Sequence, residues 1–293
     1  MKKSHFIGII VSVGFFVFIS CSKAPESIPE SKVLIYTSFY PLKHFTKWIM
    51  PEAQIEEVIP SQVDPHNFEP SLKDIQKLYN ASMVVYLGST DVDRWIDKIK
   101  EDLALKGVKL IRLQDHIEFK KYSSAKELDP HLWLDPVLVS EIIRVIKDKV
   151  KEIYPENKDA YEKNFSIYTE KLKELDREYR QNLSNCSLKD VVTTHEFLNY
   201  LSARYGFSFH FVVHEPDEEP SLKKIKNLKS LIKKKSIEYI ISEQEGERIA
   251  QSLSEETGVK ILKFNTFHQS STSDYFQTMR ENLKVLKTAL GCR

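Results

Sequence analysis

The sequence has little of three features that would point to particular classes of protein. Its formal net charge is +1, from 43 Lys and Arg against 42 Asp and Glu, so no strong field would draw it to nucleic acid or an anionic membrane. Its first apolar stretch, Ile7 to Ile19, has 13 residues, which is too short to cross a bilayer as a helix. Cysteine occurs three times, so at most one disulfide can form within the chain. Low-complexity segments and short-period repeats are also absent from the sequence.

The first twenty residues have the pattern of an export signal. Lys2 and Lys3 precede the apolar stretch, whose length suits a signal-peptide core. The stretch ends in Ser20-Cys21, which resembles a lipoprotein signal in which Cys21 is lipidated and becomes the first mature residue. The other interpretation is an ordinary secretory signal with an incidental cysteine. Residues 21–31 have the composition of a flexible tether, and an exported chain can oxidise Cys186 and Cys292 to a disulfide.

Short apolar runs alternate with helical patterns along the rest of the chain, which predicts an α/β fold. We expect a first lobe over residues 32–153, a linking helix over 154–186 and a second lobe over 187–293. Between Asn157 and Leu183 there is neither Gly nor Pro, and apolar residues recur at spacings of three and four. A helix of this length suits a rigid strut across two lobes. The predicted strands are 33–36, 55–59, 83–87, 108–113, a short one at 191–192, 209–213, 239–241 and 260–264. The predicted helices are 42–49, 72–80, 93–100, 136–153, 157–183, 196–205, 222–235, 250–257 and 275–290.

Three histidines stand out by their context. His66 and His131 each follow Asp-Pro, and the aspartate can accept a hydrogen bond from one ring nitrogen so that the other keeps its lone pair for a metal. His195 follows a predicted strand, and the carboxyl ends of strands are where α/β proteins bind ligands. Taken singly, each histidine is as well explained as a surface or helix-capping residue. Together, three imidazoles from distant segments predict a divalent-metal site in a cleft between the lobes.

Imidazole ligands suit Zn²⁺ and also Fe, Ni and Cu, whereas Mn²⁺ prefers more carboxylate. A tetrahedral zinc site needs a fourth ligand or a water molecule. Glu243 and Asn265 follow predicted strands of the second lobe, and His268 lies just beyond, so all three are candidates. Because the ligand imidazoles must be neutral, affinity is expected to fall below about pH 6.

From about Val33 onward the chain resembles the zinc/manganese solute-binding proteins of ABC importers. The matching residues are Phe39–Leu42, Asp64–Pro70, Val84–Gly88 with Trp95, Asp129–Pro136, His195–Phe197 with Tyr200, Tyr205-Gly206, Glu219–Ser221 and Glu243. The resemblance implies two α/β lobes that move little on binding, with His66, His131 and His195 as metal ligands. It also implies a carboxylate after the last strand, where this chain has Asn265.

The resemblance favours a monomeric, lipid-anchored and exported protein, periplasmic or on the cell surface. Such a protein captures Zn²⁺, or alternatively Mn²⁺ or Fe²⁺, and delivers it to a membrane ABC permease. It has no chemical step. Two other functions compete with this one. A surface adhesin could use the same fold, and a three-histidine zinc hydrolase or lyase would need a general base, for which Glu196 is the nearest residue in sequence. Glu196 is expected to point away, since neighbouring residues of a helix do not share a face.

Overall fold

The computed structural model describes residues 33–122, 127–216, 218–270 and 274–293. Within these residues, two parallel sheets of four strands form, with the orders β2-β1-β3-β4 and β6-β5-β7-β8. The predicted signal and tether, residues 1–31, lie outside this range. The strands are β1 Leu34–Thr37, β2 Gln54–Glu57, β3 Met83–Tyr86, β4 Lys109–Arg112, β5 Asp190–Thr193, β6 Ser208–Phe211, β7 Tyr239–Ser242 and β8 Lys260–Lys263.

Helices follow most of the strands, as the alternating pattern predicts. The α-helices are α1 Tyr40–Ile49, α2 Leu72–Tyr79, α3 Arg94–Asp97, α4 Lys100–Leu105, α5 Pro136–Ile153, α6 Lys158–Asn182, α7 Asn199–Tyr205, α8 Leu222–Lys235, α9 Glu247–Thr257 and α10 Tyr275–Leu290. Short 3₁₀ helices are η1 Pro65–Asn67, η2 Leu113–Asp115, η3 His131–Leu134 and η4 Pro155–Asn157. No helix among the described residues combines the length and apolar character needed to cross a bilayer.

Each sheet is covered on both faces, because its strands carry apolar residues on both sides. In the first lobe, Ile35 and Val85 face a core shared with α1 and α5, whereas Val84 faces α2, α3 and α4. In the second lobe, Val191 and Ile241 belong to the same shared core, and the opposite face packs against α8 and α9. One continuous core therefore runs beneath both sheets and holds the two lobes to each other.

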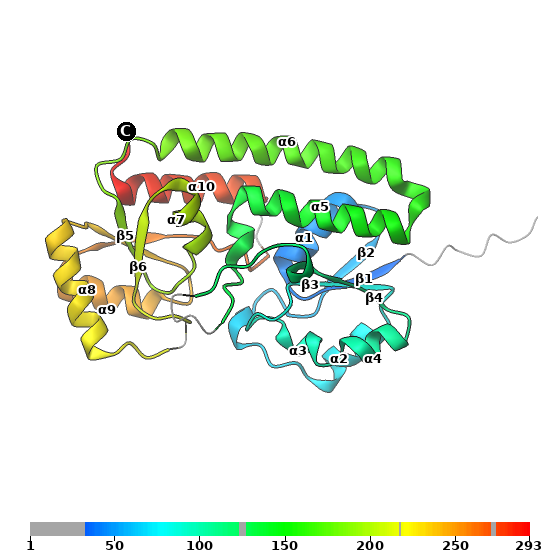
Figure 1. Ribbon diagram of the computed structural model, residues 1–293. Coiled ribbons are helices and arrows are strands. Elements are labelled where there is room, and N and C mark those ends of the chain that lie inside the picture. The colour runs from blue at the N-terminus through cyan, green and yellow to red at the C-terminus, as the bar shows by residue number, and fades with distance from the viewer. Residues whose placement is uncertain (1–32, 123–126, 217, 271–273) are drawn as a thin grey trace, which may run out of the picture. The chain divides into compact units, whose positions relative to one another are not determined.

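The long helix α6 extends along both lobes (Figure 1). Near its start, Asn164 donates a hydrogen bond to the carbonyl of Ile49 at the end of α1, at 3.1 Å. Near its end, the hydroxyl of Tyr179 donates to the carbonyl of Met279 in α10, at 2.6 Å. The predicted fold, two four-stranded parallel lobes joined by one long helix, is confirmed.

Two helix predictions in the chain need correction. The segment predicted as one helix over 93–100 is divided between α3 and α4. The helix predicted over 196–205 begins only at Asn199. The backbone before it is held in a turn, because the hydroxyl of Thr193 donates to the carbonyl of His195 at 2.7 Å. His195 thus lies in a tight turn at the end of β5, not at the start of a helix.

Cys186 and Cys292 form a disulfide. Cys186 follows the end of α6, and Cys292 follows the end of α10. The bond therefore ties the start of the second lobe to the last residues of the chain.

Candidate metal centre

Three imidazoles converge between the lobes. His66 lies in η1 after β2, His131 begins η3, and His195 follows β5. The Nε2 atom of His131 lies 3.3 Å from that of His66 and 3.5 Å from that of His195. Among the described residues these three are the group whose ligand atoms all lie within 4.8 Å of one another. Two nitrogens bound to one tetrahedral Zn²⁺ stand about 3.3–3.4 Å apart, so the spacing fits that ion.

Each of these imidazoles has a carboxylate at its other nitrogen. Asp129 Oδ1 lies 2.7 Å from Nδ1 of His131, and Glu243 Oε1 lies 3.0 Å from Nδ1 of His195. A carboxylate in this position holds the proton on Nδ1 and leaves the Nε2 lone pair free. When all three rings are neutral and carry their proton on Nδ1, the three Nε2 atoms face one another with free lone pairs.

His66 departs from the predicted arrangement. The sequence hypothesis, in which the aspartate two residues before the histidine holds its ring, is confirmed for His131 and wrong for His66. Asp64 instead accepts a hydrogen bond from the backbone nitrogen of His66 at 3.0 Å. The ring is held by Asp91, whose Oδ2 lies 2.6 Å from Nδ1. Sequence reasoning missed Asp91, although its place in the loop after β3, at the same sheet edge as His66, was a usable signal.

In the metal-free site, the pKa values of His131 and His66 are shifted in opposite directions. Burial, reinforced by the neighbouring imidazoles of His66 and His195, lowers the pKa of His131 well below its ordinary value. Burial also opposes charge on His66, but Asp91 outweighs it and raises the pKa of His66 to about 9. Glu243 is buried too, yet the adjacent His195 lowers the pKa of its carboxyl to about 2. His66 consequently holds a proton at neutral pH that a metal ion must displace.

The chamber around the three histidines is small. Its volume is about 10 Å³, which holds a single ion or water molecule and excludes any organic solute. Besides the histidines, the chamber is lined by Asp64, Pro65, Trp133, Pro216, Glu245, Thr266 and His268. Loops from both lobes therefore close over the site.

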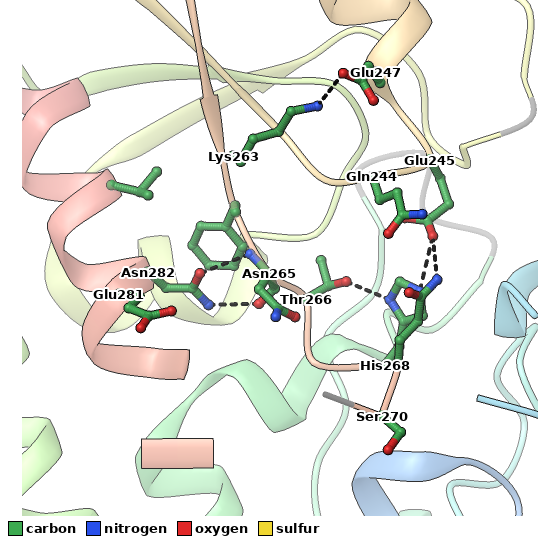
Figure 2. A pocket seen from close by; sticks show the side chains of 13 residues that line it. Gln244, Glu245, Glu247, Lys263, Asn265, Thr266, His268, Ser270, Glu281 and Asn282 are labelled. Carbon is green, nitrogen blue, oxygen red and sulfur yellow. Dashed lines mark hydrogen bonds and ion pairs between the residues drawn. The ribbon is translucent and has the colours of Figure 1, made fainter. Parts of the chain in front are cut away.

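The three candidates for a fourth ligand occupy different places. Glu243 lies behind His195, as described above. Asn265 braces its own loop, because its Oδ1 accepts a hydrogen bond from the backbone nitrogen of Phe267 at 2.8 Å. His268 lines the chamber, with Nδ1 2.5 Å from the hydroxyl of Thr266 and Nε2 3.2 Å from Glu245 Oε1 (Figure 2).

A larger cavity of about 570 Å³ adjoins the chamber on the second lobe. Glu245, Thr266 and His268 line both spaces, so they form the wall between them. Figure 2 labels the three among the residues of the larger cavity. Asn265 and Asn282 line only the larger cavity. A hydrogen bond from a side chain to the backbone fixes the wall, because Trp133 Nε1 donates to the carbonyl of Thr266 at 2.7 Å.

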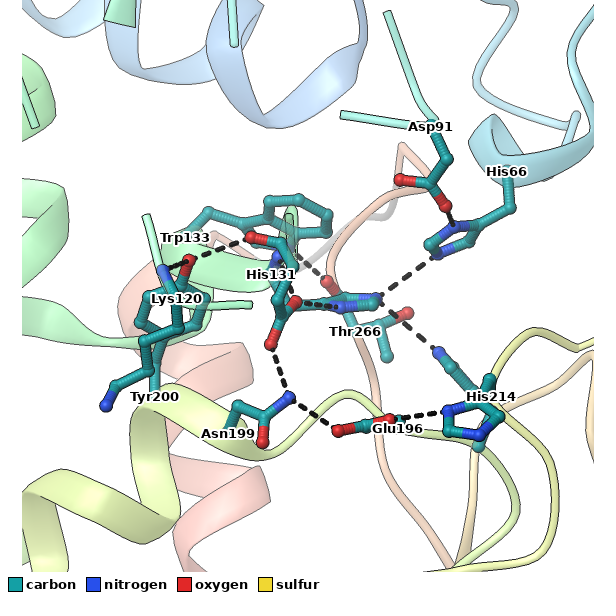
Figure 3. A network of polar contacts seen from close by, with 12 residues as sticks. His66, Asp91, Lys120, His131, Trp133, Glu196, Asn199, Tyr200, His214 and Thr266 are labelled. Atoms are coloured by element: carbon teal, nitrogen blue, oxygen red, sulfur yellow. Dashed lines mark hydrogen bonds and ion pairs between the residues drawn. The ribbon is translucent and has the colours of Figure 1, made fainter. Parts of the chain in front are cut away.

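Glu196 is engaged away from the chamber. Its carboxylate accepts from Asn199 at 3.1 Å and lies 2.8 Å from Nδ1 of His214 (Figure 3). Asn199 also donates to Asp129 Oδ2 at 2.9 Å, so a chain of polar contacts runs outward from His131. Glu196 is fully buried in this network. It holds Asn199, which contacts the aspartate behind His131, and it does not line the chamber where a metal-bound water molecule would lie.

The family model described as "Zinc-uptake complex component A periplasmic" matches residues 35–289. The chain belongs to this family. The family's description is of a component of a zinc-uptake complex.

Two named relatives are similar to the chain over nearly its whole length. The chain is 32% identical over 310 residues to the zinc-binding lipoprotein AdcA of Streptococcus pneumoniae, covering 98% of this chain and 61% of the relative. It is 29% identical over 310 residues to the high-affinity zinc uptake system protein ZnuA of Bacillus subtilis, covering 97% of each chain. The chain thus spans 61% of the length of AdcA and nearly all of ZnuA.

A solved structure matches the fold as well. The Zn(II)-bound ZnuA-like domain of S. pneumoniae AdcA has a TM-score of 0.79 and 33% sequence identity to this chain. The match covers 88% of this chain and 99% of that domain. The two-lobed architecture of the family is therefore present here nearly in full.

Proposed function

We propose that the chain captures one Zn²⁺ between its lobes and delivers it to an ABC permease in the membrane. The observation that carries the proposal is the position of His131 Nε2, 3.3 Å from that of His66 and 3.5 Å from that of His195, with all three ligand atoms within 4.8 Å of one another, which fits ligands of one tetrahedral ion. His66, His131 and His195 are the proposed ligands. Family membership supports the uptake role, and the chamber admits nothing larger than an ion.

The donor set favours zinc over manganese. The three proposed ligand atoms are imidazole nitrogens, which suit Zn²⁺ better than Mn²⁺. The three carboxylates contact the far nitrogens of the histidines and so lend negative charge without occupying a coordination position. Fe²⁺ also accepts imidazole, so Mn²⁺ and Fe²⁺ are the cations to compete against zinc.

For the fourth position we propose His268, in place of Asn265 or Glu243. His268 is the one of the three that lines the chamber. To reach the ion, its Nε2 must leave Glu245, a contact of 3.2 Å. His268→Ala is then expected to weaken zinc binding about tenfold or more, whereas Asn265→Ala changes it less than about threefold. Equal effects of the two substitutions in a competition titration would leave a water molecule as the fourth ligand.

The proposed location of the protein in the cell rests on its sequence. Residues 1–20 are a signal peptide, Cys21 is lipidated, and residues 21–31 tether the protein to a membrane facing the periplasm or the cell exterior. The lobes are assigned to residues 32–153 and 187–293, with 154–186 as the link. The protein acts as a monomer. Mass spectrometry of the mature chain decides the anchor, because lipid on Cys21 adds a defined mass that Cys21→Ser removes.

The decisive experiment is metal competition on the chain from residue 22 onward. The protein is stripped with a chelator and titrated with Zn²⁺, Mn²⁺ and Fe²⁺ in a calorimeter. We expect one tight zinc site per chain, which His195→Ala abolishes. Failure of all three ions to bind in a stoichiometric ratio would sink metal capture. Metal that does not exchange, with tight binding of a host macromolecule, would favour the adhesin.

A further inference from the structure

The residue before His268 has a backbone conformation that few side chains adopt. Phe267 lies in the loop after β8, and its φ of 61° is in the left-handed region. A bulky side chain is strained there, and such a backbone persists only where surrounding contacts hold it. Among the described residues, Ser236 is the other non-glycine residue with positive φ, and it ends α8, where this conformation is usual. Phe267 ends no helix, so its conformation needs another cause.

The ring of Phe267 crosses from the second lobe into the first. The residue is fully buried, and its ring centroid lies 5.1 Å from that of His44 and 5.4 Å from that of Tyr40, both in α1. Tyr275 of α10 contacts the same ring at 5.3 Å. Burial lowers the pKa of His44 to about 4, so His44 is neutral at pH 7 and packs here as an uncharged ring. Phe267 therefore anchors a loop of the second lobe in the core beside α1.

Hydrogen bonds hold the backbone on both sides of Phe267. Its own nitrogen donates to Asn265 Oδ1 at 2.8 Å. Asn282 of α10 donates to the carbonyl of Asn265 at 2.7 Å and accepts from its nitrogen at 2.9 Å (Figure 2). The carbonyl of Thr266 accepts from Trp133 in η3. These contacts fix the turn from both lobes, so the fold sets the direction of the next residue.

His268 is that next residue. It lines the chamber together with Thr266, whereas Phe267 between them is buried in the core and does not line it. The Nε2 atom of His268 lies 3.2 Å from Glu245 Oε1. Because the backbone is already held in the turn, only the side chain of His268 has to rotate for Nε2 to leave Glu245.

We propose that Phe267 is a positioning residue, which holds the backbone of His268 beside the chamber so that His268 can complete the zinc site. A ligand on a fixed backbone loses less conformational freedom on binding than one on a mobile loop, and the affinity for the ion is higher as a result. Phe267 acts through His268, since its own side chain does not line the chamber. The inference rests on the proposed function, with His268 as the fourth ligand.

Substitution of buried aromatic residues separates positioning from general stability. Phe267→Ala and Phe267→Leu are compared with Phe276→Ala in the chain from residue 22 onward. Phe276 is also buried and contacts Trp48 and Tyr275, but its ring does not contact that of Phe267, so it is a matched control. We expect Phe267→Ala to weaken zinc binding about five- to tenfold. Phe267→Leu keeps apolar bulk in the core and should restore most of the affinity, and Phe276→Ala should change it less than about twofold.

The same substitution in a His268→Ala background completes a double-mutant cycle. There, Phe267→Ala should change zinc affinity less than about twofold, because no fourth ligand is left to position. An equal loss of affinity in both backgrounds overturns the proposal, and so does an equal loss in Phe276→Ala. If Phe267→Ala does not fold, His44→Ala removes the facing ring and takes its place in the cycle.

A second measurement needs no zinc. In the chelator-stripped chain, amide hydrogen exchange over residues 265–270 should be about tenfold faster in Phe267→Ala and unchanged in Phe276→Ala. Unchanged exchange in Phe267→Ala refutes the anchoring role, even where the wild type binds zinc. Failure of the wild type to bind zinc refutes the proposed function instead, and the exchange rates still decide whether Phe267 holds the loop.

Discussion

The two lobes share a scaffold but contribute unequally to the metal centre. Both sheets have the same strand order, and both lobes contain the segment Glu-Pro-Ser-Leu-Lys, at residues 69–73 and 219–223. Their loops differ in chemistry. The loop after β2 supplies His66 to the chamber, whereas the matching loop after β6 carries His214, which contacts the buried Glu196. Both rings have a carboxylate at Nδ1, Asp91 for His66 and Glu196 for His214, but only His66 lines the chamber, so what differs is where the carboxylate holds the ring.

The strongest test of this difference compares removal of a proposed ligand with removal of a histidine that does not line the chamber. His195→Ala is expected to weaken zinc binding by more than about 100-fold, because it deletes a proposed ligand. His214→Ala is expected to change affinity less than about threefold, because His214 touches the ligand shell only through Glu196. Competition against a fluorescent chelator measures both. A large loss in His214→Ala would mean that the outer network shapes the site as strongly as the ligands do.

The disulfide gives the second lobe a constraint that the described part of the first lobe lacks. Cys186 and Cys292 are 106 positions apart, and closing so long a loop restricts the unfolded chain considerably. The double substitution Cys186→Ser with Cys292→Ser should lower the free energy of unfolding by about 3 kcal/mol. Denaturation in urea checks this value, with reductant on the wild type as the control. Zinc affinity should persist, since neither cysteine lines the chamber. An unchanged midpoint in both samples would show that the disulfide adds no stability.

The two aspartates near His66 test ring orientation within one lobe. Asp91→Asn should weaken zinc binding about 10- to 100-fold, because the amide no longer supplies the charge that holds Nδ1–H. Asp64→Asn keeps an oxygen for the backbone nitrogen of His66 and should cost less than about threefold. Competition against the fluorescent chelator compares the zinc affinities of the two variants. If Asp64→Asn had the larger effect, the loop backbone would matter more than the ring partner.

The raised pKa of His66 predicts proton release on binding. Because Asp91 raises the pKa of His66 to about 9, the metal-free protein carries this proton at pH 7 and loses it as pH rises through 9. Zinc binding at pH 7 should release about one proton, and affinity should climb with pH up to about 9. Calorimetry in two buffers of different ionisation enthalpy counts the proton. The sequence alone predicted a fall only below about pH 6, because it did not reveal Asp91. Binding without proton release at pH 7 would show that His66 is already neutral.

Much of the fold could be read from the sequence because local signals and burial agree. The helices at 136–153, 222–235 and 275–290 were predicted with their observed bounds, and each is preceded by a capping side chain, Asp135, Ser221 or Asp274. The three converging histidines were also predicted, since each follows a recognisable signal. The structure brings them together as that prediction required.

The rest of the site depends on contacts between distant segments, which no local pattern reveals. Asp91 reaches His66 across 25 positions, and Trp133 fixes the Thr266 loop across 133 positions. The predicted helix start at 196 failed for a similar reason, because Thr193 captures the carbonyl of His195 and holds a turn. Asn265 occupies the position where the resemblance implies a carboxylate, yet its side chain is committed to the backbone of Phe267.

The long helix α6 has a consequence for how long an ion stays bound. Its 25 residues hydrogen-bond to α1 near one end and α10 near the other, and a continuous helix resists bending. Moving the lobes apart would break that helix or its hydrogen bonds. The loops over the chamber can move without breaking either of them. The residence time of the ion is then governed by the loops, and substitutions in α6 should change thermal stability before they change the rate at which zinc escapes.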